Sequence, residues 1–190
     1  DLDSHGLNMR LDINLEDDTS LDVINISNES SKSNFLNFRQ KINIGKNSVL
    51  KNYSLDINPT SNIKYLYKDI NLDQNSHLEY FILSKGSKFA KHDINCSLNN
   101  NHGSIALNGI IDLDNKKHHE IKTVINHNEE NCKSYQLIKS VLSENSKGIY
   151  QGKIYVNSKA QKTDGYQLSR ALLLNDDVEF NAKPELEIYA

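Results

Sequence analysis

The feature that most constrains the fold is an alternation of apolar and polar residues that returns at regular intervals along the whole chain. Leu11, Ile13 and Leu15 alternate with polar residues, and the same pattern recurs in residues 90–98 and 105–113. A period of two residues is the signature of a β-strand with one buried face. The chain is therefore predicted to consist mainly of strands.

The strand-like segments follow one another about 10 to 17 residues apart. They begin near Leu11, Leu21, Leu36, Val49, Ile63, Leu78, Phe89, Ser104, Glu120, Tyr135, Ile149, Tyr166, Val178 and Glu185. This rhythm is typical of a sandwich, a barrel or a β-solenoid. The absence of Trp, the scarcity of Asn-Gly hairpin signals and the unbroken run of strands favour the solenoid, with a sandwich as the alternative. Helical spacing is confined to residues 135–142, where serines weaken it.

Two strands carry a specific expectation about their faces. The alternate residues from Leu36 to Ile44 are expected to share one face. Val49, Lys51, Tyr53, Leu55 and Ile57 are expected to share another.

Composition excludes several classes of protein. The 190 residues carry a net charge of −3, which disfavours nucleic-acid and anionic-membrane binding. Hydrophobic residues make up 37%, so a thin core is expected, and the longest apolar runs, such as residues 171–174, are far too short to span a bilayer. Residues 1–6 show no secretory signal and no initiator Met, which indicates a fragment of a longer product. Two cysteines favour a reducing cytoplasm over a disulfide scaffold.

Asparagine is the most unusual component. There are 26 Asn against 8 Gly and 2 Pro, so the turns are expected to rely on Asn, which tolerates left-handed backbone conformations. Residues 99–101 are a predicted corner, and residues 28–34 a predicted loop. The alternative is that the Asn excess, together with 19 Lys to 3 Arg, reflects an AT-rich genome.

Metal-ligating residue types are present, but their spacing is poor. The candidates are His92, His102, His118, His119, His127, Cys96 and Cys132. His118 and His119 are adjacent and would point to opposite faces of a strand, while His92 and Cys96 would lie about 13 Å apart along one. Buried or surface roles for these residues are therefore favoured over a bound metal.

Two carboxylate pairs offer a weaker hint of chemistry. Asp112 with Asp114, and Glu185 with Glu187, are spaced to share a strand face, as a β-helix polysaccharide enzyme would use for calcium binding or acid–base catalysis. Solvated strand faces produce the same pattern. No nucleophile elbow, dinucleotide-binding or phosphate-binding glycine motif accompanies them.

Residues 148–174 carry a more specific pattern than the rest of the sequence, because Gln, Lys and Arg side chains are interleaved at strand positions. In a solenoid such groups would stack on equivalent positions of the next coil and fix its register. The residues expected to do so are Gln151, Lys153, Gln161, Lys162, Gln167 and Arg170. If the Arg170 guanidinium is buried, its removal is expected to cost about 1–3 kcal/mol.

These motifs resemble the core domain of the SufB/SufD family of iron–sulfur cluster assembly scaffolds, and are closer to the SufD side. The family signatures Q-G-K-I, A-Q-K-T-D-x-x-Q, R-x-L-L-L and K-P-x-L-E-I-Y-A match residues 151–154, 160–167, 170–174 and 183–190. Leu107-Asn108-Gly109 and an H-x4-C-x-S element at His127, Cys132 and Ser134 also match. The strong match covers roughly residues 101–190, and the earlier residues fit by strand pattern alone.

The resemblance implies a right-handed parallel β-helix core spanning residues 1–190 and truncated at both ends. In the family this core pairs with a SufB-like homologous subunit, a SufC-like ATPase docks on helices outside it, and the complex builds clusters with sulfur from a desulfurase. A non-catalytic, cytoplasmic scaffold is therefore expected. The cluster is expected to be handled by the full complex, with no cofactor, metal, nucleic acid or membrane bound by this segment.

The resemblance marks a set of structural signature residues and two weak ligand candidates. The signature residues are Gln151, Gly152, Lys153, Gln161, Lys162, Thr163, Asp164, Gln167, Arg170, Lys183 and Pro184; the weak candidates are His127 and Cys132. Glu130 and Asn131 stand where relatives often have Pro-His, which weakens a metal role for Cys132. The alternative function is a β-solenoid carbohydrate-active enzyme or adhesin.

Overall fold

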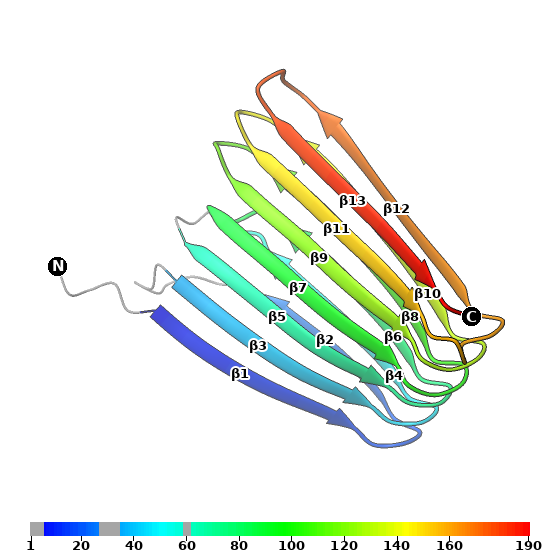
Figure 1. The fold of residues 1–190 in the computed structure, drawn as a ribbon. Helices are drawn as coiled ribbons and strands as arrows, with labels where there is room; N and C mark the ends of the chain where they lie inside the picture. The colour runs from blue at the N-terminus through cyan, green and yellow to red at the C-terminus, as the bar shows by residue number, and fades with distance from the viewer. Residues whose placement is uncertain (1–5, 27–34, 59–61) are drawn as a thin grey trace.

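The computed structural model describes residues 6–26, 35–58 and 62–190, which form two facing parallel sheets. Successive strands alternate between the sheets, so each turn of the chain adds one strand to each (Figure 1). The first sheet, sheet A, holds β1 (Gly6–Leu15), β3 (Phe35–Ile44), β5 (Ile63–Leu72), β7 (Phe89–Leu98), β9 (His118–His127), β11 (Lys147–Val156) and β13 (Glu179–Ile188). The second, sheet B, holds β2 (Ser20–Ile26), β4 (Val49–Asp56), β6 (His77–Ser84), β8 (Ser104–Leu113), β10 (Lys133–Leu142) and β12 (Asp164–Leu173).

This arrangement is a β-solenoid of about six turns, which confirms the predicted fold class. The sandwich alternative is wrong, because the neighbours within each sheet pair in parallel. The described residues contain no helix, and hence none that could cross a membrane.

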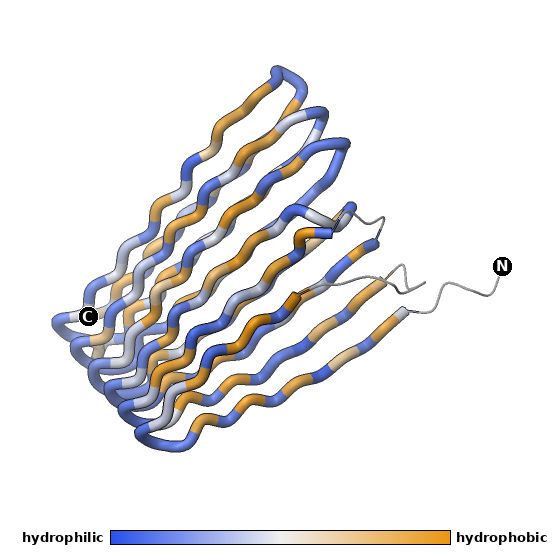
Figure 2. Tube along the Cα trace, turned by 180° about the vertical axis from the view of Figure 1, so that it is seen from behind, coloured by the Kyte–Doolittle hydropathy of each residue, from blue (hydrophilic) through white to orange (hydrophobic). Residues whose placement is uncertain are grey.

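The core lies between the sheets and is built from columns of like residues. Alternate residues of each strand point inward, and the parallel register places them on the equivalent residues of the next turn. Figure 2 shows the corresponding alternation of hydrophobic and hydrophilic residues along the strands. One column of sheet A consists of Ile13, Ile42, Ile70, Cys96, Ile125, Ile154 and Leu186. β-branched side chains pack well on such a pleated surface, so this column stabilises the stack.

Val49, Lys51 and Tyr53 share one face, as expected, and it is the outer face of β4, because Leu50 and Asn52 are the buried residues. Ile57 lies beyond β4, which ends at Asp56. Two details of the strand predictions are corrected. The segments predicted to start at Val178 and Glu185 form one strand, β13, and residues 135–142 are strand rather than helix. The predicted loop at residues 28–34 lies outside the described residues.

Asparagine serves the corners, as predicted. Among the residues that the structure describes, ten non-glycine residues have positive φ, and five of them are Asn, namely Asn47, Asn75, Asn115, Asn131 and Asn145. No described glycine has a positive φ. Residues 99–101 do lie at a corner, although the left-handed residue there is His102.

Asparagine also has a second role that the composition did not reveal. The side chains of Asn14, Asn43, Asn71, Asn99 and Asn128 form a ladder in which each amide N–H donates to the side-chain oxygen of the turn below, at 2.7–3.2 Å. An amide has both donors and an acceptor, so identical side chains satisfy one another from turn to turn. This ladder accounts for five of the 26 Asn residues.

Candidate functional site

The H-x4-C-x-S element comes together at the corner between β9 and β10. His127 is fully buried at the end of β9, in the column where the two preceding turns place Leu72 and Leu98. Its Nε2 lies 2.8 Å from Ser134 Oγ, and its Nδ1 contacts Thr163 Oγ1 of the next turn. Three residues of the predicted signatures thus meet inside the solenoid.

The direction of these hydrogen bonds can be assigned. The Thr163 hydroxyl donates to the Cys132 carbonyl oxygen at 2.7 Å, so it must accept from His127 Nδ1–H. Nε2 is then the acceptor for the Ser134 hydroxyl. The result is a continuous series of hydrogen bonds from the Ser134 hydroxyl through His127 and Thr163 to the carbonyl oxygen of Cys132.

Burial keeps both weak ligand candidates in their uncharged forms. Loss of hydration lowers the pKa of His127 to about 4, so the imidazole is neutral at pH 7. Burial likewise raises the pKa of the Cys132 thiol, whose Sγ lies 3.4 Å from the carbonyl oxygen of Asn100. A protonated thiol is a poor nucleophile and a poor metal ligand. The corner is therefore suited to fixing the turn.

We expect acid to destabilise the solenoid through this histidine. Its folded pKa lies below the unfolded value of about 6.5, so the unfolded chain binds the proton first. The contribution of the neutral His127 to the free energy of unfolding is complete above about pH 6.5 and is lost as the pH falls towards about 4. Urea unfolding between pH 7 and pH 4 should show a decline of more than about 1 kcal/mol that is shallower in His127→Leu. An identical pH slope in that variant would contradict the assignment.

A second network links the last turns around Gly152. Tyr150 Oη lies 3.3 Å from Gln136 Oε1 and 3.4 Å from Gln167 Oε1, and Gln167 Nε2 donates to the backbone oxygen of Glu185 at 3.0 Å. Gly152 provides the space, because a Cβ there would lie 2.3 Å from Tyr150 Oη and 2.4 Å from Gln167 Oε1. The glycine of Q-G-K-I and the second glutamine of the A-Q-K-T-D-x-x-Q signature thus belong to one packing unit.

The other signature residues lie on the outer surface or at corners, except Pro184, which occupies the inward-facing row of Gly152. Lys153 reaches the next turn and pairs with Glu187 at 2.8 Å, and Lys183 pairs with Glu185 at 2.6 Å. Asp164 opens β12 and Pro184 lies in β13 beside Gly152. The side chains of Gln151, Gln161, Lys162 and Arg170 are exposed. The stability loss stated for a buried Arg170 therefore does not apply.

The carboxylate pairs are neutralised by lysines. Asp112 pairs with Lys85 at 2.6 Å, and Asp114 pairs with Lys117 at 2.7 Å. Asp114 follows the end of β8, so the two carboxylates do not share a regular strand face. Glu185 and Glu187 are the partners of Lys183 and Lys153.

The histidines and cysteines do not gather into a ligand set. His119 is buried while its neighbour His118 lies on the outer face, as the alternation predicted. Within residues 6–26, 35–58 and 62–190, no three His, Cys, Asp or Glu side chains are grouped so that they could hold a metal ion.

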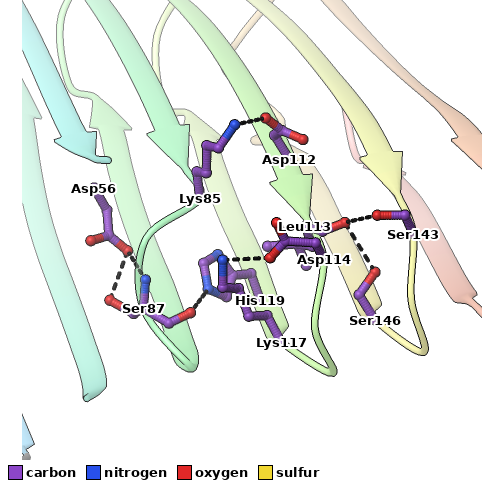
Figure 3. A network of polar contacts seen from close by, with 10 residues as sticks. All are labelled: Asp56, Lys85, Ser87, Asp112, Leu113, Asp114, Lys117, His119, Ser143 and Ser146. Carbon is purple, nitrogen blue, oxygen red and sulfur yellow. Dashed lines mark hydrogen bonds and ion pairs between the residues drawn. The ribbon is translucent and has the colours of Figure 1, made fainter. Parts of the chain in front are cut away.

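A buried polar cluster that the sequence did not predict lies at the corner where β4 and β6 end and β7 and β9 begin. Asp56 and Lys64 form an ion pair of 2.9 Å with side chains 4% and 1% exposed. Asp56 also accepts the backbone N–H and the hydroxyl of Ser87, whose carbonyl oxygen lies 2.7 Å from His119 Nε2 (Figure 3). Ser84 joins His119 to His92, at 2.8 and 3.3 Å.

Burial and polar contacts have opposite effects on the pKa of the buried carboxylate in this cluster. Burial by itself would raise the pKa of Asp56, but Lys64 and the two Ser87 bonds outweigh it and hold that pKa below the ordinary value. Burial lowers the pKa of His92 to about 3. It also lowers to about 7 the pKa of Lys68, a buried residue of β5 that donates to Gln40 and is felt electrostatically by His92. The sequence signal for this cluster was a Lys or His residue at an inward position of an alternating strand. No spacing rule distinguishes such a position from an outward position, so the cluster could not be predicted.

Comparison with known proteins places this architecture in a family. The model of the family described as the SUF system FeS cluster assembly, SufBD core domain, matches residues 2–190. The chain belongs to this family. The predicted resemblance is therefore confirmed, and it extends over the first hundred residues as well.

Three curated relatives agree with the SufBD core assignment. The iron-sulfur cluster assembly protein SufD of Escherichia coli is 30% identical over 159 residues, which cover 82% of this chain and 37% of that protein. SufBD family proteins of Synechocystis sp. and Mycobacterium leprae are 27% and 23% identical, over 55% and 62% of this chain and 23% and 32% of their own lengths. The chain thus spans well under half the length of these relatives.

Proposed function

We propose that this SufBD core is the β-helical frame of a SufD-like, non-catalytic scaffold subunit in an iron–sulfur cluster assembly complex. Its partners are a SufB-like homologous subunit and a SufC-like ATPase, and the cluster is handled by the assembled complex. The family and the SufD relative support the role in cluster assembly.

The observation that carries the scaffold role is how the reactive side chains are used. Both nitrogens of His127 are engaged by Thr163 and Ser134, and Cys132 is a buried thiol. Cys96 is likewise fully buried in the isoleucine column, where burial raises its pKa. Side chains that elsewhere bind metals or attack substrates here pack the solenoid.

The strand edges support pairing with a homologous subunit. The backbone N–H groups of the even-numbered Asp164 and Leu174 donate to β10 and the residue before it. The odd-numbered residues of β12 therefore direct their N–H groups to the free edge of the sheet. In β13 the backbone N–H groups of the odd-numbered Glu179 and Tyr189 donate to the neighbouring strand, β11, and the residue before it. The even-numbered residues therefore face the free edge of the sheet, and one of them, Pro184, has no N–H to offer there. β12 therefore has the more complete edge for strand addition by a partner.

Co-expression tests the assignment. The full reading frame containing this chain, produced with SufB-like and SufC-like proteins under anaerobic conditions, is expected to co-purify with both and to carry iron and sulfide in the complex. Recovery of the protein with neither partner and without iron would contradict the scaffold role.

The carbohydrate-active alternative lacks a supporting observation. Asp112 and Asp114, which would have to act on a sugar or bind calcium, are each paired with a lysine.

A further inference from the structure

The outer faces of both sheets follow a rule of charge pairing between turns. Most outward strand lysines stand in register with an acid on a neighbouring strand, which stabilises the stack. Lys183 stands in register with Gln151 and pairs with Glu185 of its own strand instead. The pairs are Lys41 with Asp12 and Asp69, Lys51 with Asp22 and Glu79, Lys91 with Glu120, Lys122 with Asp93, Lys133 with Asp164, Lys147 with Glu179, and Lys153 with Glu185.

Lys139 and Arg170 break this rule. They stand side by side in register on β10 and β12, with Ile110 as the next residue in the row. Both are exposed, and neither forms an ion pair with any residue that the structure describes. The other pair of cations in register, Arg10 and Arg39, is compensated by Asp12 and by the Tyr67 ring. Like charges placed directly opposite are unfavourable, so this pair has a cost that the fold does not offset.

The surface beside the two cations is apolar. Tyr135 and Tyr166 stack with ring centroids 4.9 Å apart and are 43% and 44% exposed. Between the tyrosines and the cations runs a row of outward side chains in register across five strands of sheet B. The row consists of Tyr53, Phe81, Asn108, Leu137 and Leu168, and it is apolar except for Asn108. A hollow beside Phe81 is lined by the small side chains of Ala106 and Asn108, with His77 and Glu79 at its other side.

We infer that this face, the Lys139/Arg170 face, docks an acidic amphipathic helix of a partner protein. The cations would meet two carboxylates on one side of the helix, and the row of apolar side chains would cover its hydrophobic stripe. This inference goes beyond the scaffold role and does not depend on it.

The dimensions favour a helix that crosses the strands. Adjacent strands lie about 4.8 Å apart, close to the 5–6 Å that separates side chains at positions i and i+4 of a helix. Five strands span roughly 19 Å, the length of a helix of about 13 residues. Because the cation pair and the apolar row run in the same direction, a single helix would contact both.

Charge favours protein over nucleic acid as the occupant. The cation pair is local, and the chain as a whole carries a net charge of −3. Phosphate backbones require a run of cations, whereas two cations beside leucines and tyrosines match a partner with both carboxylates and apolar side chains.

A peptide-binding experiment with the 190-residue chain tests the inference. The probe is a fluorescent 14-residue peptide in which Leu residues at i, i+3, i+4 and i+7 spacing form one stripe. Two Glu residues, four positions apart from each other, lie beside that stripe. Comparison peptides carry Lys in place of Glu, or the same residues in scrambled order. Fluorescence anisotropy then compares the wild-type chain with Lys139→Glu/Arg170→Glu and with a matched control, Lys46→Glu/Lys159→Glu, whose lysines are exposed at corners.

We expect the acidic peptide to bind the wild type and the control similarly, and to bind the Lys139→Glu/Arg170→Glu variant at least 10-fold more weakly. The lysine and scrambled peptides should bind at least 10-fold more weakly to the wild type. Equal loss in both double variants would overturn the inference. So would tighter binding of single-stranded RNA or phosphatidylglycerol vesicles than of the acidic peptide.

A second measurement needs no variant and therefore does not depend on how the variants fold. The acidic peptide with a central benzophenone is irradiated with the wild-type chain, and the cross-linked residues are mapped. Cross-links on the outer face of β8, β10 and β12 are expected. Cross-links confined to sheet A or to the corners would contradict the proposed face.

Discussion

We expect Lys64→Met to lose about 3–5 kcal/mol of unfolding free energy at pH 7, measured by urea denaturation. The substitution removes the ammonium group that faces Asp56 at 2.9 Å inside the solenoid. Ser87 still binds the carboxylate, but its charge is left without a buried counter-ion. An uncompensated charge in the core is among the most destabilising single changes.

Two controls separate burial from charge pairing. The double variant Asp56→Leu/Lys64→Met removes both charges and is expected to regain most of the loss, because a well-packed apolar pair often matches a buried ion pair. Lys153→Met breaks an ion pair whose side chains are 33% and 42% exposed, and should cost less than about 1 kcal/mol. If Lys64→Met were no more destabilising than Lys153→Met, the buried pair would not be structural.

The same pair should add a second acid transition. The folded pKa of Asp56 lies below its ordinary value, so its contribution is present above about pH 4 and is lost as the pH falls through the folded pKa. This loss lies below the range in which His127 titrates. The Asp56→Leu/Lys64→Met variant should therefore lose the lower step while retaining the upper one.

We expect Gly152→Ala to cost about 3 kcal/mol, at the upper end for overpacking of a core. The new Cβ would lie within 2.4 Å of both Tyr150 Oη and Gln167 Oε1, and only 2.6 Å from the Tyr150 ring carbon Cζ. Tyr150 is fully buried, so its ring has little room to move. Thermal and urea unfolding of the variant are the measurements.

A double variant tests the mechanism. Gly152→Ala combined with Tyr150→Leu removes the obstructing hydroxyl and ring, so its loss should be smaller than the sum of the two single losses by at least about 1 kcal/mol. A matched control is Gly103→Ala, where the nearest atom would lie 3.4 Å from the new Cβ. Strict additivity, or an equal cost at Gly103, would contradict the packing role of Gly152.

Much of the fold was accessible from local patterns. The columns containing Ile94 and Ile111 follow from alternation alone, since a period of two places these side chains on one face whatever the partner strand is. The strand containing Val49 and Lys51 shows the limit of that rule. Both of its faces carry apolar and polar residues, and the buried face was decided by what Leu50 and Asn52 meet inside the solenoid.

The site divides in the same way. The signatures containing His127, Thr163, Gly152 and Gln167 were visible in the sequence, and the resemblance they carry identified the family. Their contacts were not visible, because Thr163 reaches His127 across 36 residues and Gln167 reaches Tyr150 across 17. Such contacts depend on the number of residues in each turn, which sets which side chains stack.

Alone, then, the sequence determined that the chain is a stack of strands, that its corners use asparagine, and that it is a SufBD core. Only the tertiary structure decided that Lys64 lies inside against Asp56 and that Lys139 stands beside Arg170. The physical reason is that a two-residue period specifies which side chains share a face, whereas burial and charge pairing depend on the register between turns.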